Sequence, residues 1–232
     1  MAITQYLAMT AAEMMGGAAL PEKTAWMACH FSPYSTGLCN LPAALPPGSL
    51  LILNDRTPIH GHDPERICRE LGEALEGLRC AGLLVDFQNP PRRESTELVG
   101  YLAQHLKFPL GVPPGYSAEG AAVFAPPVPT DTPAAAYLEK WRGKQIWLEL
   151  ALEGQTITLT ESGAAYGINS FPAAPPAMAD EALHCHYSIE EKPDAIVFRT
   201  WRTRQDLAGL LSDAERLGVT LSVGLYQELR PA

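Results

Sequence analysis

The stretch Ala81-Gly82-Leu83-Leu84-Val85-Asp86-Phe87-Gln88 decides how the rest of the chain is interpreted. It is a short apolar run that ends in a carboxylate and a carboxamide, with helical patterns on both sides, which is typical of a strand in a parallel sheet. Strand alternation places Leu84, Asp86 and Gln88 on one face. Because functional groups in a barrel of parallel strands lie at the C-terminal strand ends, we expect Asp86 and Gln88 to line a site.

Length and charge narrow the class of protein. The 232 residues suit a single domain, expected to span 1–232. Seventeen basic and 26 acidic residues give a net charge of -9, and no run is rich in Lys or Arg, which argues against nucleic acid or an anionic membrane surface as a partner. No segment has the pattern of a signal peptide or a membrane span. Five scattered cysteines without a C-x-x-C pair favour a reducing, cytoplasmic setting.

The first half of the chain alternates strands with helices. Strands are expected at 3–9, at 25–31, where Trp26, Ala28 and His30 would share a face, and at 50–53, which ends on Asn54-Asp55-Arg56. The focal strand at 81–88 is then the fourth. Asp63-Pro64 predicts the start of a helix before it, and Ser95 predicts the cap of a helix after it, from which the chain returns at 109–112.

The second half is less regular. A strand at 121–124 precedes a helix capped by Thr132-Pro133, and the strands at 145–152 and 156–160 are expected to form a hairpin around Gly154. The composition of 163–179 indicates a loop, and 183–189 is expected to pair with the hairpin. The end of the chain predicts a βαβ unit, with strands at 195–198 and 219–225 and a helix capped by Thr203.

The focal strand resembles the fourth-strand motif D-G-x-D-x-D-x-E of glycoside hydrolase family 18, the chitinase-like barrels. Gly82 matches the glycine of that motif and Asp86 its last aspartate, whereas Ala81, Leu84 and Gln88 stand where the family has acids. The resemblance implies an α/β fold, a (β/α)8 TIM-barrel-like domain, here with a β-hairpin insertion near residues 145–160. An open parallel sheet is the alternative fold.

The three departures from the motif bear on activity. In the resembled family the glutamate is the general acid, and the aspartate before it holds the substrate's acetamido group, which acts as nucleophile. A carboxamide at Gln88 has no acidic proton to give. The leading hypothesis is therefore a chitinase-like barrel that has lost hydrolysis and keeps a carbohydrate or small-ligand cleft. The alternative is an active glycoside hydrolase whose acid has moved to Asp55, Glu149 or Glu228.

Further site residues are chosen by side-chain type. Asn54 ends a strand, as Asp86 and Gln88 do, and is expected to bind ligand with them. The aromatic rings of Tyr34, Trp201 and Tyr226 lie near strand ends, where such rings stack on sugars. No G-x-G-x-x-G or G-x-x-x-x-G-K-[ST] pattern is present, so no cofactor is expected.

Two His-x-His pairs raise the question of a metal. His184 and His186 would share one face of a strand, and His30 with Asp86 would complete a ligand set. His60 and His62 instead precede a helix, with no H-E-x-x-H pattern nearby. We therefore assign no metal ligand, and a metal-dependent hydrolase using these histidines remains a third hypothesis.

Overall fold

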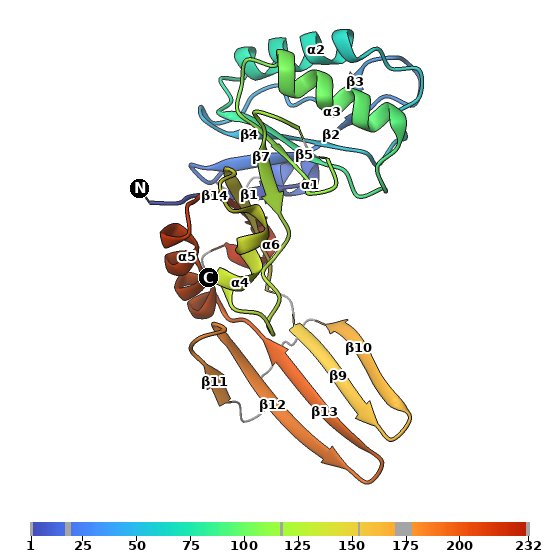
Figure 1. Ribbon diagram of the computed structural model, residues 1–232. Helices are drawn as coiled ribbons and strands as arrows, with labels where there is room; N and C mark the ends of the chain where they lie inside the picture. Colours follow the sequence, from blue (N-terminus) through green and yellow to red (C-terminus); the bar gives the residue numbers. More distant parts are fainter. Residues whose placement is uncertain (1, 17–19, 117, 153, 170–177, 231–232) are drawn as a thin grey trace.

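The computed structural model describes residues 2–16, 20–116, 118–152, 154–169 and 178–230. Its centre is a closed barrel of eight parallel strands, because β1 pairs with the last strand, β14, as well as with β2 (Figure 1). The expected TIM-barrel fold is confirmed, and the open sheet is excluded. The barrel strands are β1 (Thr4–Met9), β2 (Thr24–Phe31), β4 (Leu50–Asn54), β5 (Gly82–Asp86), β6 (Leu110–Val112), β7 (Ala122–Ala125), β8 (Ile146–Leu150) and β14 (Val219–Leu225).

The focal strand is β5, the fourth strand of the barrel, which is the position that the family resemblance requires. The weakest expected strand, at 3–9, exists as β1 and closes the barrel. A two-residue strand, β3 (Leu38–Cys39), lies antiparallel to the end of β2. It holds the loop after β2 beside the C-terminal end of the barrel.

Helices connect the strands and cover the barrel. They are α1 (Ala11–Met15), α2 (Pro64–Gly77), α3 (Arg93–His105), α4 (Ala134–Leu138) with the 3-10 turn η1 (Glu139–Trp141), α5 (Arg204–Arg216) and α6 (Tyr226–Leu229). Asp63 and Thr203 cap α2 and α5 as expected. No helix within the described residues is long and apolar enough to cross a membrane.

Two expected caps are wrong. Helix α3 begins before Ser95, whose hydroxyl reaches back to accept a bond from the Arg92 amide, 2.9 Å away. Helix α4 begins after Pro133 without a side-chain cap, because the Thr132 hydroxyl donates to Asp131 instead. In both cases the hydroxyl group bonds to a different partner from the one that a helix N-cap would bind.

The core has two layers that follow strand alternation. Inside the barrel, Leu84 packs with residues of the other strands, among them Trp147. Gly111 makes room for this indole, because a Cβ there would lie 2.3 Å from the ring. Between the barrel and α2 and α3, the other face of β5 packs a larger cluster that includes Leu83, Val85 and Phe87. The two faces of β5 are therefore divided as the sequence predicts.

A second sheet is inserted between β8 and α5. Its five antiparallel strands lie in the order β10-β9-β13-β12-β11, and it projects from the barrel on the side away from α2 and α3 (Figure 1). The strands are β9 (Gly154–Thr160), β10 (Gly163–Asn169), β11 (Met178–Asp180), β12 (Cys185–Lys192) and β13 (Ala195–Trp201).

The insertion exists, but its expected pairing was wrong in three places, one of which is that the expected strand at 183–189, observed as β12, pairs with β11 and β13 and not with the segment 145–160. The segment 145–152 forms barrel strand β8, parallel to β7 and β14, and β9 forms its hairpin with β10 instead. The segment 195–198 belongs to β13, antiparallel to β9 and β12, and is not a barrel strand. The expected loop 163–179 contains β10 and the start of β11, and its residues 170–177 lie outside the described residues.

Candidate functional site at the barrel mouth

Three polar residues form a row across neighbouring barrel strands. His30 of β2 is in register with Asn54 of β4, and Asn54 is in register with Asp86 of β5. Residues in register on adjacent parallel strands point to the same side. Each of the three lies at the C-terminal end of its strand, so the row marks the barrel mouth, where barrel enzymes carry out their chemistry.

A register shift in β2 explains why His30 belongs to this row. The pairing with β4 is irregular between Trp26 and Cys29, and beyond it Cys29 and Phe31 pack in the same outer cluster as Trp26. A bulge of this kind reverses the alternation of the side chains that follow it. His30 therefore points into the mouth. Strict alternation had predicted that it shares a face with Trp26, and this prediction is wrong.

The row lines a cavity of about 510 Å³. Its wall combines the ends of the first four barrel strands with the loops that follow them. The lining residues that carry polar side chains include His30, Asn40, Asn54, Asp55, Arg56, Asp86, Gln88 and Asn89, and Thr10 to Ala12 close one side. The cavity is large enough for a small ligand and offers mostly uncharged hydrogen-bonding groups.

Asp86 and Gln88 interact directly in this cavity. The side-chain nitrogen Nε2 of Gln88 donates a hydrogen bond to Oδ1 of Asp86. Burial raises the pKa of Asp86 above its usual value, the bond from Gln88 partly opposes this, and the nearby Asp55 raises the pKa further. The bond uses the amide nitrogen of Gln88, so its carbonyl oxygen remains an acceptor. The pair can bind hydroxyl or amide groups, but Gln88 cannot protonate a leaving group.

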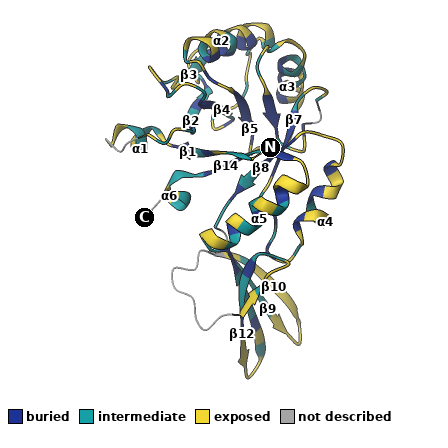
Figure 2. Cartoon of the chain, turned by 90° about the vertical axis from the view of Figure 1, so that its left-hand side faces the viewer, coloured by how far each residue is buried: buried dark blue, intermediate teal, exposed yellow. Residues whose placement is uncertain are grey.

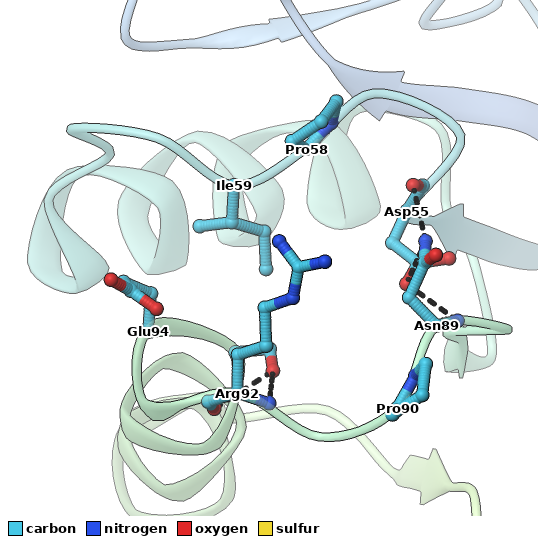
Figure 3. A pocket seen from close by; sticks show the side chains of 8 residues that line it. Asp55, Pro58, Ile59, Asn89, Pro90, Arg92 and Glu94 are labelled. Carbon is cyan, nitrogen blue, oxygen red and sulfur yellow. Dashed lines mark hydrogen bonds between the residues drawn. The ribbon is translucent and has the colours of Figure 1, made fainter.

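Asp55 holds the loop after β5 in place. Its carboxylate accepts bonds from the backbone amides of Gln88 and Asn89, at 2.9 and 3.0 Å, and from the side chain of Asn89 at 2.8 Å. Figure 3 shows Asp55 and Asn89 together on one side of a smaller cavity of about 70 Å³, across from Arg92 and Glu94 of the α3 end. With three donors on one buried carboxylate, Asp55 acts as the positioning residue for Gln88.

The other two candidate acids lie in different places. Glu149 of β8 lines an inner cavity of about 50 Å³ together with Asp86 and Leu84. Glu228 of α6 accepts a bond from the backbone amide of Leu152, 3.0 Å away, and so ties α6 to the end of β8. Of the candidate acids, Glu149 is thus the one that shares a cavity with Asp86 deep in the barrel.

The three aromatic candidates are spread over the molecule. Tyr34 is 96% exposed in the loop after β2. Trp201 is buried in β13 with its ring stacked on His186, at 6.1 Å between centroids. Tyr226 is half-buried at the start of α6, directly after β14. None of the three lines the mouth cavity or the inner cavity.

The histidine pairs do not converge on one point. His184 lies 2.9 Å from Asp213 and His186 lies 2.8 Å from Asp206, two different carboxylates of α5. His184 has a positive φ of 48° just before β12, so the two side chains do not alternate as on one strand. Within the described residues no group of three or more His, Cys, Asp or Glu side chains gathers as a metal site. The ligand set with His30 and Asp86 that the third hypothesis requires is therefore not formed among these residues.

Sequence reasoning did not assign several mouth residues to the site. Asn40 follows the short strand β3, Asn89 follows Gln88, and Arg56 follows Asp55. Asn40 adopts a positive φ of 57°. Asparagine is enriched in this conformation, so its residue type was a local signal for a turn at this position. Its position in the mouth depends on β3 pairing with β2, which is a tertiary contact.

Comparisons with known proteins agree with the barrel. No protein-family model and no curated protein sequence matches the chain. Solved structures do. The chitinase-like agglutinin RobpsCRA from Robinia pseudoacacia is 9% identical, with a TM-score of 0.64, covering 97% of this chain and 95% of that one.

Two enzymes are similar to a comparable degree. A Glu-to-Gln mutant of the class V chitinase from Nicotiana tobaccum, in complex with NAG4, is 9% identical with a TM-score of 0.59, covering 96% of this chain and 93% of that one. The spore cortex-lytic enzyme SleL from Bacillus cereus is 10% identical with a TM-score of 0.57, covering 98% and 71%. The protein is thus an α/β barrel with a polar mouth. Its fold is that of the GH18 chitinases, as the motif at β5 indicated.

Proposed function

We propose that this protein is a chitinase-like barrel that binds a carbohydrate or another small polar ligand in its mouth and has lost glycosidic hydrolysis. The observation that carries the proposal is the bond from Gln88 to Asp86. It places a carboxamide beside the aspartate that matches the motif, where the resembled family has its acid. A site with this pair retains hydrogen-bonding groups for a sugar but lacks the proton donor.

The inward face of β5 supports the same conclusion. Leu84 is buried among apolar residues of the barrel interior, at the motif position where the family has an aspartate. A leucine has no hydrogen-bonding group, so it cannot bond the neighbouring Asp86 as an aspartate there could. The general acid and one motif aspartate are thus replaced, whereas Asp86, at the position of the aspartate before the acid, is retained.

Two of the similar structures make binding without hydrolysis reasonable. The Nicotiana tobaccum chitinase was obtained as a Glu-to-Gln mutant with NAG4 bound, so a glutamine substitution is compatible with a bound oligosaccharide in that protein. RobpsCRA is named a chitinase-like agglutinin. The mouth cavity of this chain is lined by the amides of Asn40, Asn54, Gln88 and Asn89 as well as by Asp55, Arg56 and Asp86, and these groups fit a polyhydroxylated ligand.

Calorimetry with (GlcNAc)4 and turnover of fluorogenic chitin oligosaccharides test the proposal together. We expect binding without turnover, and loss of binding in Asp86→Ala. Asp194→Ala, in the exposed turn between β12 and β13, is the control and should bind as the wild type does. Turnover that Asp86→Ala abolishes would refute the loss of hydrolysis, and failure of (GlcNAc)4 and other neutral sugars to bind would refute the carbohydrate.

One observation favours a second candidate, an active glycoside hydrolase with a relocated acid. Asp86 and Glu149 line the same inner cavity, from two different barrel strands. Glycosidases use two carboxyl groups about 5 Å apart when they retain configuration and about 6.5 to 9.5 Å apart when they invert it. For this candidate, Glu149→Gln should abolish a measured turnover while leaving sugar binding intact.

A further inference from the structure

The inserted sheet has two faces of opposite character. Directly paired residues of adjacent strands share a face. One row runs Tyr166, Ile157, Phe198 and Ile189 across β10, β9, β13 and β12, and the next runs Ala164, Leu159, Ile196 and Glu191. A third row, on the same face, contains Ile168, Gln155, Thr200, Tyr187 and Met178. We call this the apolar face.

The opposite face is more polar, although it also carries the buried Val197 and, at the end near the barrel, Trp201. Between these rows lie Thr156 and Thr158 of β9 and the ion pair of Arg199 with Glu190, at 2.7 Å. An antiparallel sheet with one polar and one apolar face normally buries the apolar one. The polar face can therefore remain in contact with water, whereas the apolar face is expected to pack against another surface.

Much of the apolar face is open. Tyr166 is 77% exposed and Ile168 is 73% exposed, and Met178, Ile189, Ile196 and Leu159 are each exposed by 38% or more. At the end near the barrel, Thr200 lies 2.6 Å from Thr130, so the loop after β7 covers that corner. Beyond this corner the apolar residues remain exposed, as the outer parts of β9 and β10 in Figure 2 illustrate.

We propose that the apolar face is a dimer interface that packs against the same face of a second copy of this chain. Glu191 is the single charged side chain in the three rows. Two copies can therefore pack face to face without burying charged groups at the centre of the interface. Such a self-complementary patch fits the two-fold symmetry of most homodimers. Sheets that pack face to face, about 10 Å apart, bury side chains of this kind.

The size of the face agrees with a reversible dimer. Four strands about 4.8 Å apart, with about seven residues each at about 3.3 Å per residue, have a footprint of roughly 440 Å² per copy. The two footprints, with the additional surface of the projecting side chains, give a total buried area at the lower limit of about 1,000 Å² for a specific interface. We therefore expect association in the micromolar range.

The composition of the face favours a protein over other occupants. Aliphatic side chains outnumber aromatic ones, and few polar groups are present to bond sugar hydroxyls. The face has no lysine or arginine among its three rows and the chain has a net charge of -9, so an anionic lipid surface is disfavoured. A vesicle or an oligosaccharide that occupies the face is thus an outcome that would refute the dimer.

Sedimentation velocity between about 1 and 100 µM tests the proposal, since this range brackets a micromolar Kd. We expect the wild type to shift from monomer to dimer, and Tyr166→Lys and Ile189→Lys to stay monomeric with unchanged circular dichroism. Ala165→Lys places the same charge on the polar face of the same strand and should dimerise like the wild type.

Three results would overturn the dimer: a wild type that is monomeric throughout the range, a dimer that survives both lysine variants, or equal disruption by Ala165→Lys. If Tyr166→Lys fails to fold, Ile189→Lys on a different strand gives an independent answer. No residue that lines the mouth cavity belongs to the inserted sheet, so sugar binding and dimerisation can succeed or fail separately.

Discussion

At the scale of the residue, Asp86 is held in a state that disfavours its charge. Burial and the neighbouring Asp55 raise its pKa, and one bond from Gln88 compensates only in part. A carboxyl whose pKa is raised on folding binds its proton more tightly in the folded state. Its contribution to stability is therefore complete below the pKa of the unfolded chain and is lost as the pH rises through the folded-state pKa.

This gives a prediction for Asp86→Asn. The asparagine oxygen still accepts from Gln88, and the cost of a buried charge disappears. We expect the variant to be more stable than the wild type by about 1 kcal/mol at pH 7, with the difference vanishing below about pH 4. Thermal unfolding from pH 3.5 to 8 measures it, with Asp194→Asn as the exposed control. A variant that is less stable at pH 7 would contradict the argument.

Gln88→Glu tests the neighbouring position. Gln88 is exposed, so a carboxylate there stays hydrated, and we expect a stability loss of at most about 1 kcal/mol. The added charge should raise the pKa of Asp86 further, because two carboxylates side by side resist ionising together. Urea unfolding gives the first quantity and NMR titration of the Asp86 carboxyl the second. Leu84 still replaces one aspartate of the motif, so hydrolysis is not expected to return.

The chemistry of the mouth was partly readable from the sequence. Asn54, Asp86 and Gln88 were predicted because polar residues closed apolar strands, and they do line one cavity. His30 was misplaced because strand alternation was assumed to continue through β2, whereas the register shift before Cys29 reverses it. A bulge is set by the partner strand and leaves no clear local pattern.

At the scale of the element, the junction between the insertion and α5 depends on buried polar groups. Arg202, just after β13, donates to the carbonyl oxygens of Val128, Pro129, Leu183 and His184. His184 packs so closely on α5 that a Cβ at Gly209 would lie 2.5 Å from its ring. Arg202 is 6% exposed, and its guanidinium joins the loop after β7 to the segment before β12.

Arg202→Ala is therefore expected to be severely destabilising. It leaves four carbonyl groups without their donor in a buried place, which should cost about 3 kcal/mol or more. Arg199→Ala, in β13 just before Arg202, is the matched control. It removes a surface ion pair with Glu190 and should cost less than about 1 kcal/mol. Urea unfolding measures the free energy of unfolding of both variants. Similar losses of stability in the two would show that the junction does not depend on Arg202.

Strand positions were easier to predict than strand partners. β8 was found in the sequence but paired with β9, because Gly154 follows it in a short polar turn that looks like a hairpin. Its real partners, β7 and β14, are far away in the sequence. Similarly, β13 precedes α5 just as a barrel strand would, so its antiparallel pairing was not visible locally.

At the scale of the whole molecule, the barrel and the inserted sheet are joined in a simple way. All eight barrel strands lie outside the segment 154–201, and the barrel closes through β1, β2 and β14. The insertion also enters and leaves at neighbouring points, because Gly154 is paired with Trp201 and Gln155 with Thr200. Insertions whose ends lie side by side are those that a fold tolerates best.

This geometry allows the insertion to be removed. We predict that replacing 156–199 by Asn-Gly, as a two-residue turn between the paired Gln155 and Thr200, leaves a folded barrel. The variant should unfold cooperatively but be several kcal/mol less stable, because α5 loses His184 and His186 and Arg202 loses two of its four acceptors.

Two measurements on this variant separate the parts of the molecule. Calorimetry should give the same ligand affinity as the full chain, because the cavity around Asp86 is lined by the first four barrel strands and their loops. Sedimentation should show a monomer at every concentration, because the apolar face is gone. A variant without a cooperative transition would mean that the barrel needs the insertion to fold. One that folds but loses the ligand would place part of the binding site on the inserted sheet.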